Sequence, residues 1–104
     1  MSGGGPPSPP QPPFSCEQVR TVPLNSPQPA VAATLGVNER LFVFLDTGGG
    51  RRVLQVRTST GAIAGSLTFL GHLSMMECIE QGYSYEAVVL TISGGNIQLR
   101  IEPV

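Results

Sequence analysis

Few side chains in this sequence have the types and spacing that catalysis or metal binding requires. His72 is the only histidine, and the residue four positions after it is Met76, so the sequence shows neither a metal pair nor a catalytic dyad. Glu77 and Glu80 stand three residues apart, as on the solvent-facing side of a helix. No serine lies in a GxSxG motif. We therefore predict that the protein is not an enzyme and has no catalytic residue, metal site or cofactor.

The two cysteines also lack the spacing of a metal or redox motif. Cys16 and Cys78 lie far apart in the sequence, and neither belongs to a CxxC pair. We expect Cys78 to be a small buried apolar residue and Cys16 to be a free thiol. No apolar run approaches the roughly 20 residues of a membrane span, and the N-terminus lacks the pattern of a signal peptide. These features predict a cytoplasmic protein.

Arginine is the only source of positive charge apart from the single histidine. The six basic residues are all arginine and the net charge is −1, so no long-range field attracts nucleic acid or an anionic membrane. A local patch would still form if two strands, 53–58 and 97–102, lay close together and pointed their polar residues outwards. Several small barrels bind single-stranded nucleic acid through such faces, although ordinary solvated strands look the same in sequence. The candidate nucleic-acid-binding residues are Arg51, Arg52, Gln55, Arg57, Gln98 and Arg100.

The triple glycine at residues 48–50 resembles a phosphate-binding loop only superficially. A P-loop needs a lysine and a serine or threonine after its last glycine, followed by a helix. Here Arg51 and Arg52 follow, and then a second apolar run typical of a strand. We expect this loop to be the turn of a β-hairpin between strands 41–45 and 53–58.

The segment that organises the chain runs from residue 61 to residue 92. It reads as a strand at 63–68, a helix at 70–81, a glycine stop at Gly82 and a long apolar strand at 83–92. The spacing of the apolar helix residues predicts one buried face, made of Phe69, Leu70, Leu73, Met76 and Ile79.

Further strands complete a mainly β fold. Strands 53–58 and 63–68 should form a second hairpin, in which Gly65 marks a bulge or bend. Residues 19–22 can form a short edge strand, and residues 30–35 either a helical turn or a strand. We predict a small antiparallel β-barrel or half-barrel with one short helix in residues 14–104. The predicted inner residues are Leu41, Val43, Leu54, Val56, Leu67, Leu73, Met76, Ile79, Val88, Leu90, Leu99 and Ile101.

The first 13 residues differ in composition from the rest of the chain. They read MSGGGPPSPPQPP and contain no large side chain except Met1. Such a segment buries too little apolar surface to offset its ordering entropy, so we predict a disordered tail with polyproline II character. The tail would serve either as a solubilising segment or as a ligand for SH3-type or WW-type domains.

The second half of the chain, residues 60–104, resembles the C-terminal half of the HIRAN domain. The similarity lies in TGAIAGSLT, an apolar helix, and a G-x-x-Y-x-A-x-V pattern at Gly82, Tyr85, Ala87 and Val89. HIRAN domains are small β-barrel modules, found alone in bacteria or attached to helicases, and the resemblance implies that fold and recognition of DNA ends. The Asn-Pro-x-Asp-x-x-Ala-Val segment of the family is absent from the first half, so no DNA-binding residue is assigned from it.

These observations together predict a small, non-enzymatic binding module. A modest core, a Pro-rich tail and apolar strands with few charges favour association with a protein partner or a second copy. The alternative is HIRAN-like binding of single-stranded nucleic acid or DNA ends through the arginine and glutamine face. No membrane partner is expected.

Overall fold

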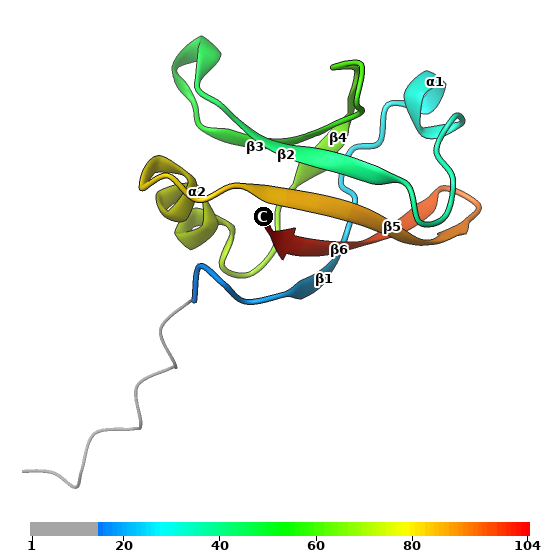
Figure 1. Cartoon of the computed structure of the whole chain (residues 1–104). Coiled ribbons are helices and arrows are strands. Elements are labelled where there is room, and N and C mark those ends of the chain that lie inside the picture. The colour runs from blue at the N-terminus through cyan, green and yellow to red at the C-terminus, as the bar shows by residue number, and fades with distance from the viewer. Residues whose placement is uncertain (1–14) are drawn as a thin grey trace, which may run out of the picture.

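A six-stranded antiparallel sheet, strongly curved into a half-barrel, forms the body of the protein (Figure 1). The computed structural model describes residues 15–104, so the prediction of a disordered tail at 1–13 lies outside the described residues. The spatial order of the strands is β1-β6-β5-β2-β3-β4. Their bounds are Arg20–Pro23 for β1, Arg40–Asp46 for β2, Val53–Arg57 for β3, Ile63–Leu67 for β4, Tyr85–Ser93 for β5 and Asn96–Pro103 for β6.

The predicted hairpins are confirmed. β2 pairs with β3 around a short 3-10 turn at Gly48–Gly50, where Gly49 and Gly50 have φ of 72° and 79°. β3 pairs with β4 around a turn in which Gly61 has φ of 90°. Glycine adopts these left-handed angles readily because it has no Cβ, so the glycines set both turns.

The last two strands make the longest pairing of the sheet. β5 and β6 pair from Tyr85 opposite Pro103 to Ser93 opposite Asn96, with a bulge between Val89 and Thr91. The expected alternation on β6 is confirmed, because Ile97, Leu99 and Ile101 are all buried. The first half of β5 is covered on both faces, whereas residues 91–93 are exposed.

The two outer strands of the sheet are joined by the connector that follows β1. Asn25 exchanges two backbone hydrogen bonds of 2.8 Å with Ser66 of β4, and its side-chain Oδ1 accepts a third from the Thr68 N–H at 2.8 Å. A Cβ atom on Gly65 would lie 2.7 Å from the Asn25 carbonyl oxygen and from Leu24 Cδ1. Gly65 is therefore the residue that allows this close approach. The predicted irregularity is present as a register shift between Val56, which faces Gly65, and Arg57.

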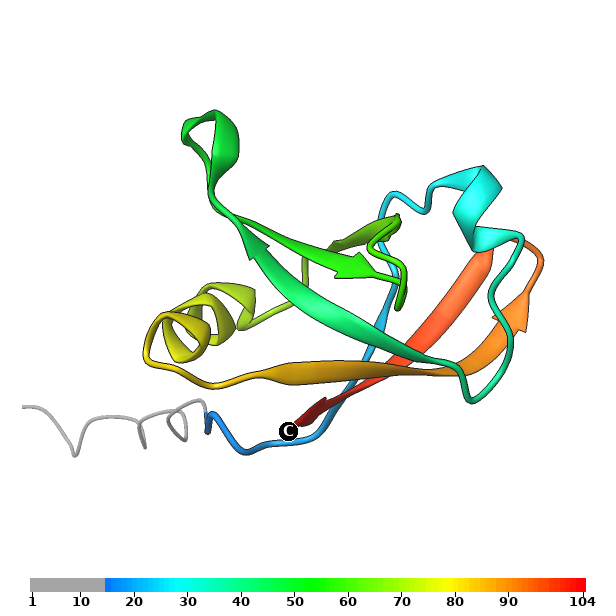
Figure 2. The same ribbon diagram turned by 45° about the horizontal axis from the view of Figure 1, so that its top comes forward.

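Residues 30–35, left open between helix and strand, form a helical turn. The turn, α1 (Pro29–Ala32), starts at proline, whose fixed φ suits the first helical position. Its backbone continues into Leu35, which is buried in the core. The connector therefore carries the chain from the β4 edge across to β2 (Figure 2).

The one longer helix, α2, spans His72–Glu80, slightly shorter than the predicted 70–81. Gly82, with φ of 108°, ends it as predicted. The Gly82 N–H donates to the Ile79 carbonyl and the Tyr83 N–H donates to the Cys78 carbonyl, both at 3.0 Å. This pair of bonds is the Schellman motif, which satisfies carbonyls at the helix end.

The predicted inner face of this helix is wrong in part. Met75, Met76 and Cys78 are buried, whereas Leu73 is 55% exposed and Leu70 is 96% exposed. Because the helix begins at His72, Leu70 lies before it. At 3.6 residues per turn, Leu73 points about 110° away from the mean direction of Met75 and Met76. Apolar residues at every third or fourth position fit two faces equally well, and packing selects the one with the methionines.

The expectation of two unpaired cysteines is also wrong. Cys16 and Cys78 form a disulfide bond between residues 62 positions apart, with their Cα atoms 5.6 Å apart. Cys78 is indeed buried, but it is a bridge partner, and Cys16 is not a free thiol. Sequence spacing does not reveal such a pair, because the fold brings the two residues together.

The corrected helix face gives a direct stability prediction. Replacing Met75 by Ala should lower the free energy of unfolding by about 2 to 5 kcal/mol, because Met75 is fully buried. Replacing the exposed Leu73 by Ala should change it by no more than about 0.5 kcal/mol. Urea denaturation followed by circular dichroism measures both variants. Equal losses for the two would show that α2 packs through a different face.

Gly65 gives a second prediction, which tests the closure of the sheet. Gly65→Ala should destabilise the protein by about 1 to 3 kcal/mol, because the new methyl group would overlap the Asn25 carbonyl and Leu24. Gly95→Ala is the matched control, since nothing lies within 4 Å of its added Cβ. Thermal unfolding of both variants decides the matter. A neutral Gly65→Ala would mean that the connector does not pack against β4.

Candidate interaction surface

Two phenylalanines lie next to each other on the outer face of β2. Phe42 and Phe44 are each 45% exposed, while Leu41 between the strand start and Phe42 is completely buried. On β3 their cross-strand partners are Arg57 and Gln55 respectively. We call these four residues the aromatic patch. The side-chain alternation of a strand explains why the phenylalanines share the face opposite to the core.

The arginine of this patch is held in place by its neighbours. The guanidinium carbon of Arg57 lies 3.8 Å from the centroid of the Phe44 ring, and its Nε and Nη2 donate to Gln55 Oε1 at 3.1 and 2.8 Å. Gln55 Nε2 in turn donates to Asp46 Oδ2 at 3.3 Å. Stacking of guanidinium on an aromatic ring combines cation–π attraction with apolar contact. The patch is therefore ordered before any partner binds.

A charged cluster borders the patch on the side of β5 and β6. Arg40 Nη1 lies 2.9 Å from Glu86 Oε1 and 3.8 Å from Glu102 Oε1, and Arg100 Nε lies 2.7 Å from Glu102 Oε2. The two carboxylates are cross-strand neighbours. Two arginines and two carboxylates leave the cluster without net charge. Exposed pairs of this kind contribute little to stability, but they remove a local positive field.

The predicted nucleic-acid-binding residues do not form one contiguous basic face. Gln55 and Arg57 lie on β3, whereas Gln98 and Arg100 lie on β6, and β2 and β5 separate the two strands. Three strand spacings amount to about 14 Å. At the hairpin end, Arg52 pairs with Glu80 of α2 at 2.8 Å, and Arg51 is exposed. The structure thus brings Gln55 and Arg57 together with the phenylalanines instead of with Arg100.

Residues 15–104 hold no cluster of three metal-binding side chains, and none of their charged residues is buried. His72 Nδ1 lies 2.9 Å from the Phe69 carbonyl oxygen, at the start of α2. Glu77 and Glu80 are both exposed, as expected for the outer side of the helix. In the same part of the chain, no helix is long and apolar enough to cross a membrane.

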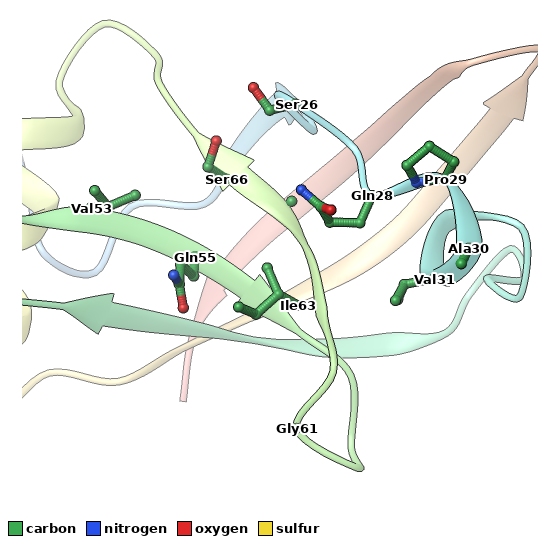
Figure 3. Close-up of a pocket in the computed structure, with 11 residues that line it drawn as sticks. Ser26, Gln28, Pro29, Ala30, Val31, Val53, Gln55, Gly61, Ile63 and Ser66 are labelled. Carbon is green, nitrogen blue, oxygen red and sulfur yellow. The ribbon is translucent and has the colours of Figure 1, made fainter. Parts of the chain in front are cut away.

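An open groove adjoins the aromatic patch on the outer side of β3 and β4 (Figure 3). It has a volume of about 700 Å³ and lies between these strands and the connector at 26–31. Gln28 reaches from the connector towards β4, and Ile63 and Val53 supply apolar walls (Figure 3). None of its lining residues is ionisable: Ser26, Gln28, Pro29, Ala30, Val31, Val53, Gln55, Gly61, Ile63, Gly65 and Ser66.

Sequence reasoning missed both the aromatic patch and the groove. Residues 41–45 are apolar at every position. The sequence pattern therefore did not distinguish an inner from an outer face, and it did not indicate that Phe42 and Phe44 remain half exposed. The one available signal was the predicted hairpin, which would place Arg57 across from this run. The groove depends on the path of the connector, which no local pattern indicates.

The start of the described chain is fixed against α2 and β5. The disulfide joins Cys16 to α2, and the Tyr85 hydroxyl donates to the Cys16 carbonyl oxygen at 2.6 Å. Burial raises the pKa of the Tyr85 phenol above its ordinary value of 10.0, with a smaller contribution from Tyr83. The phenol therefore stays protonated at neutral pH and remains a donor.

The disulfide should contribute strongly to stability. Closing a loop of 62 residues restricts the unfolded chain by about 4 kcal/mol in the chain-entropy model. Reduction, or the paired change Cys16→Ser with Cys78→Ser, should therefore lower the unfolding midpoint in urea. Unfolding with and without a phosphine reductant measures the difference, and the double variant should not respond to reductant. A wild-type midpoint that is indifferent to complete reduction would contradict this role.

Comparisons of the chain with family models, curated proteins and solved structures gave no match. The aromatic patch and the groove are therefore defined by their geometry in this protein alone.

Proposed function

We propose that the protein is a non-enzymatic module that binds another protein, or a second copy of itself, through the aromatic patch. The observation that supports this most strongly is the pair of half-exposed phenylalanines, Phe42 and Phe44, with Arg57 stacked on one of them. Aromatic residues and arginine are the types enriched at protein interfaces and at their energetic centres. A preordered arginine also loses less side-chain entropy when a partner binds.

The charge around the patch favours a protein over a nucleic acid. Arg40 and Arg100 are neutralised by Glu86 and Glu102, and Asp46 lies within the hydrogen-bonded network of Arg57. A nucleic-acid platform gains most of its affinity from unneutralised arginine and lysine, which release counterions from phosphates. The outer face offers few such groups.

Single-stranded nucleic acid is the second candidate partner. Open sheet faces with exposed aromatic rings bind single strands by stacking, and the Phe44 and Arg57 pair has this character. The resemblance to HIRAN domains points in the same direction. The division of the arginines between β3 and β6 weakens this alternative.

The disulfide bears on where the protein works. Disulfides persist in oxidising compartments and are rare where glutathione and thioredoxin keep thiols reduced. The Cys16–Cys78 bridge therefore favours an oxidising compartment over the cytoplasmic location that the sequence suggested. We therefore propose that the protein works in an oxidising environment, in which the bridge that fixes α2 to the start of the fold persists.

Replacing both phenylalanines tests the proposed surface. In the full chain, Phe42→Thr with Phe44→Thr should markedly reduce the concentration-dependent rise in mass that we expect for the wild type, because it removes the apolar centre of the interface. Threonine keeps the preference for strand. Size-exclusion chromatography with light scattering measures the mass. Ile92→Thr, at a residue 39% exposed on β5, is the matched control.

Two results would count against protein association. A wild type that stays monomeric at every concentration would exclude self-association through the patch. Salt-dependent binding of a labelled single-stranded oligonucleotide, lost when Arg57 and Arg100 are both changed to Glu, would favour the nucleic-acid alternative. At about 0.7 counterions per phosphate contact, the slope would report how many arginines take part.

A further inference from the structure

The groove beside the aromatic patch has the character of a binding site for an uncharged ligand. Its volume of about 700 Å³ lies within the range of roughly 300 to 1,000 Å³ that ligand sites occupy. No ionisable side chain lines it, so it offers no counter-charge to a phosphate, a carboxylate or an ammonium group. Its walls combine apolar side chains, such as Ile63 and Val53, with neutral hydrogen-bonding groups.

The backbone of the connector creates this site. Asn25 pairs with Ser66, but Ser26 has φ of 46°, a left-handed angle that interrupts the pairing with β4. The Gln28 N–H then bonds to the Ala64 carbonyl oxygen at 2.8 Å, so the connector returns to the strand before α1 begins. The side chains of Ser26 and Gln28 have no hydrogen-bond partner among residues 15–104 and line the groove.

We propose that this groove binds a proline-rich segment, and that its occupant is residues 6–13 of a second copy of this chain. The segment reads PPSPPQPP and contains no ionisable side chain, which matches a groove that has none. The groove shares Gln55 with the aromatic patch, but none of the other three patch residues lines it.

The chemistry of proline suits the groups that line the groove. Proline has no N–H, so a proline-rich segment brings almost no donor that would be left unsatisfied in an apolar site. Its carbonyl oxygens are acceptors, and the amide of Gln28 and the hydroxyl of Ser26 can donate to them. Its rings pack on Ile63, Val53 and Pro29. Polyproline II segments are also extended before binding, which lowers the entropic cost of association.

The position of the chain start favours a second copy as the source of the segment. The described chain begins beside α2, where the Cys16–Cys78 disulfide fixes it, whereas α1, which supplies part of the groove lining, lies at the opposite end of the molecule (Figures 1 and 2). Only residue 14 separates the segment from Ser15, so little chain is available to carry the whole segment into the groove of its own molecule. A neighbouring molecule has no such restriction.

Nuclear magnetic resonance of the full-length chain tests the proposal. A tail variant, in which every proline from position 6 to position 13 is replaced by serine, keeps the groove and removes the occupant. The backbone amide shifts of Gly61, Ile63 and Ser66 should differ between the concentrated wild type and this variant. The difference should fade on dilution, because a second copy supplies the segment. Adding a synthetic GPPSPPQPP peptide to the tail variant should move the same signals in a saturable way.

A matched pair of substitutions locates the binding. In the tail variant, Ile63→Glu should lower the affinity for the peptide by about tenfold or more, because it places a charge against an apolar ligand. Ile92→Glu changes an isoleucine of similar exposure (39% against 40%) outside the groove and should leave the affinity within about twofold. Both residues are partly exposed, so neither change should unfold the domain.

Several results would overturn the proposal. Unchanged groove signals at millimolar peptide would exclude the segment as a ligand, and equal effects of the two glutamate variants would place binding elsewhere. If the difference in amide shifts between the wild type and the tail variant persists on dilution, the bound segment does not come from a second copy. None of these results affects the aromatic patch, whose role is decided by Phe42 and Phe44, so failure of the two proposals can be told apart.

Discussion

The close contact between Gly65 and the backbone of Asn25 is the constraint on which the rest of the fold depends. An antiparallel sheet of six strands has two edges whose unpaired backbone groups invite aggregation. Here the connector after β1 pairs with β4, so the two edges meet instead of remaining open. The contact is only possible where no Cβ intervenes, and it forces the sheet to curl around Leu24 and its neighbours in the core.

Closure of the sheet also determines which surfaces remain available for binding. Most of the apolar side chains of the six strands point to the inside, and the outer face carries the aromatic patch and the neutral charged cluster. The connector that closes the sheet then forms one wall of the groove. Both candidate binding sites thus follow from the same path of the chain. They lie side by side on the outer face, where a partner could contact both.

Helix α2 depends on tertiary contacts more than on its own sequence. A nine-residue helix is too short to be stable alone in water, and no side chain caps its start. It lies where β2 and β5 diverge beyond the pair Phe42 and Glu86 (Figure 1). Three kinds of interaction hold it: the buried methionines, the disulfide to Cys16, and the ion pair of Glu80 with Arg52. Of these, the disulfide is the one that depends on redox environment.

Local sequence signals by themselves determined the hairpins, the end of the helix and the alternation on the last strand. Glycines at positive φ set the turns and the stop at Gly82, and apolar residues in alternation define β6. These features depend on interactions between residues close in sequence, so the sequence alone predicts them.

Only the tertiary structure decided the helix face, the cysteine pairing and the composition of the surface sites. The apolar residues of α2 allow more than one inward face, and the core selects Met75 and Met76. The partners Cys16 and Cys78 are 62 residues apart, and the strand order separates Arg57 from Arg100. Each of these outcomes depends on how distant segments are placed in space. Local sequence patterns do not predict such placement, because contacts between residues that are far apart in the sequence do not depend on the composition of either segment alone.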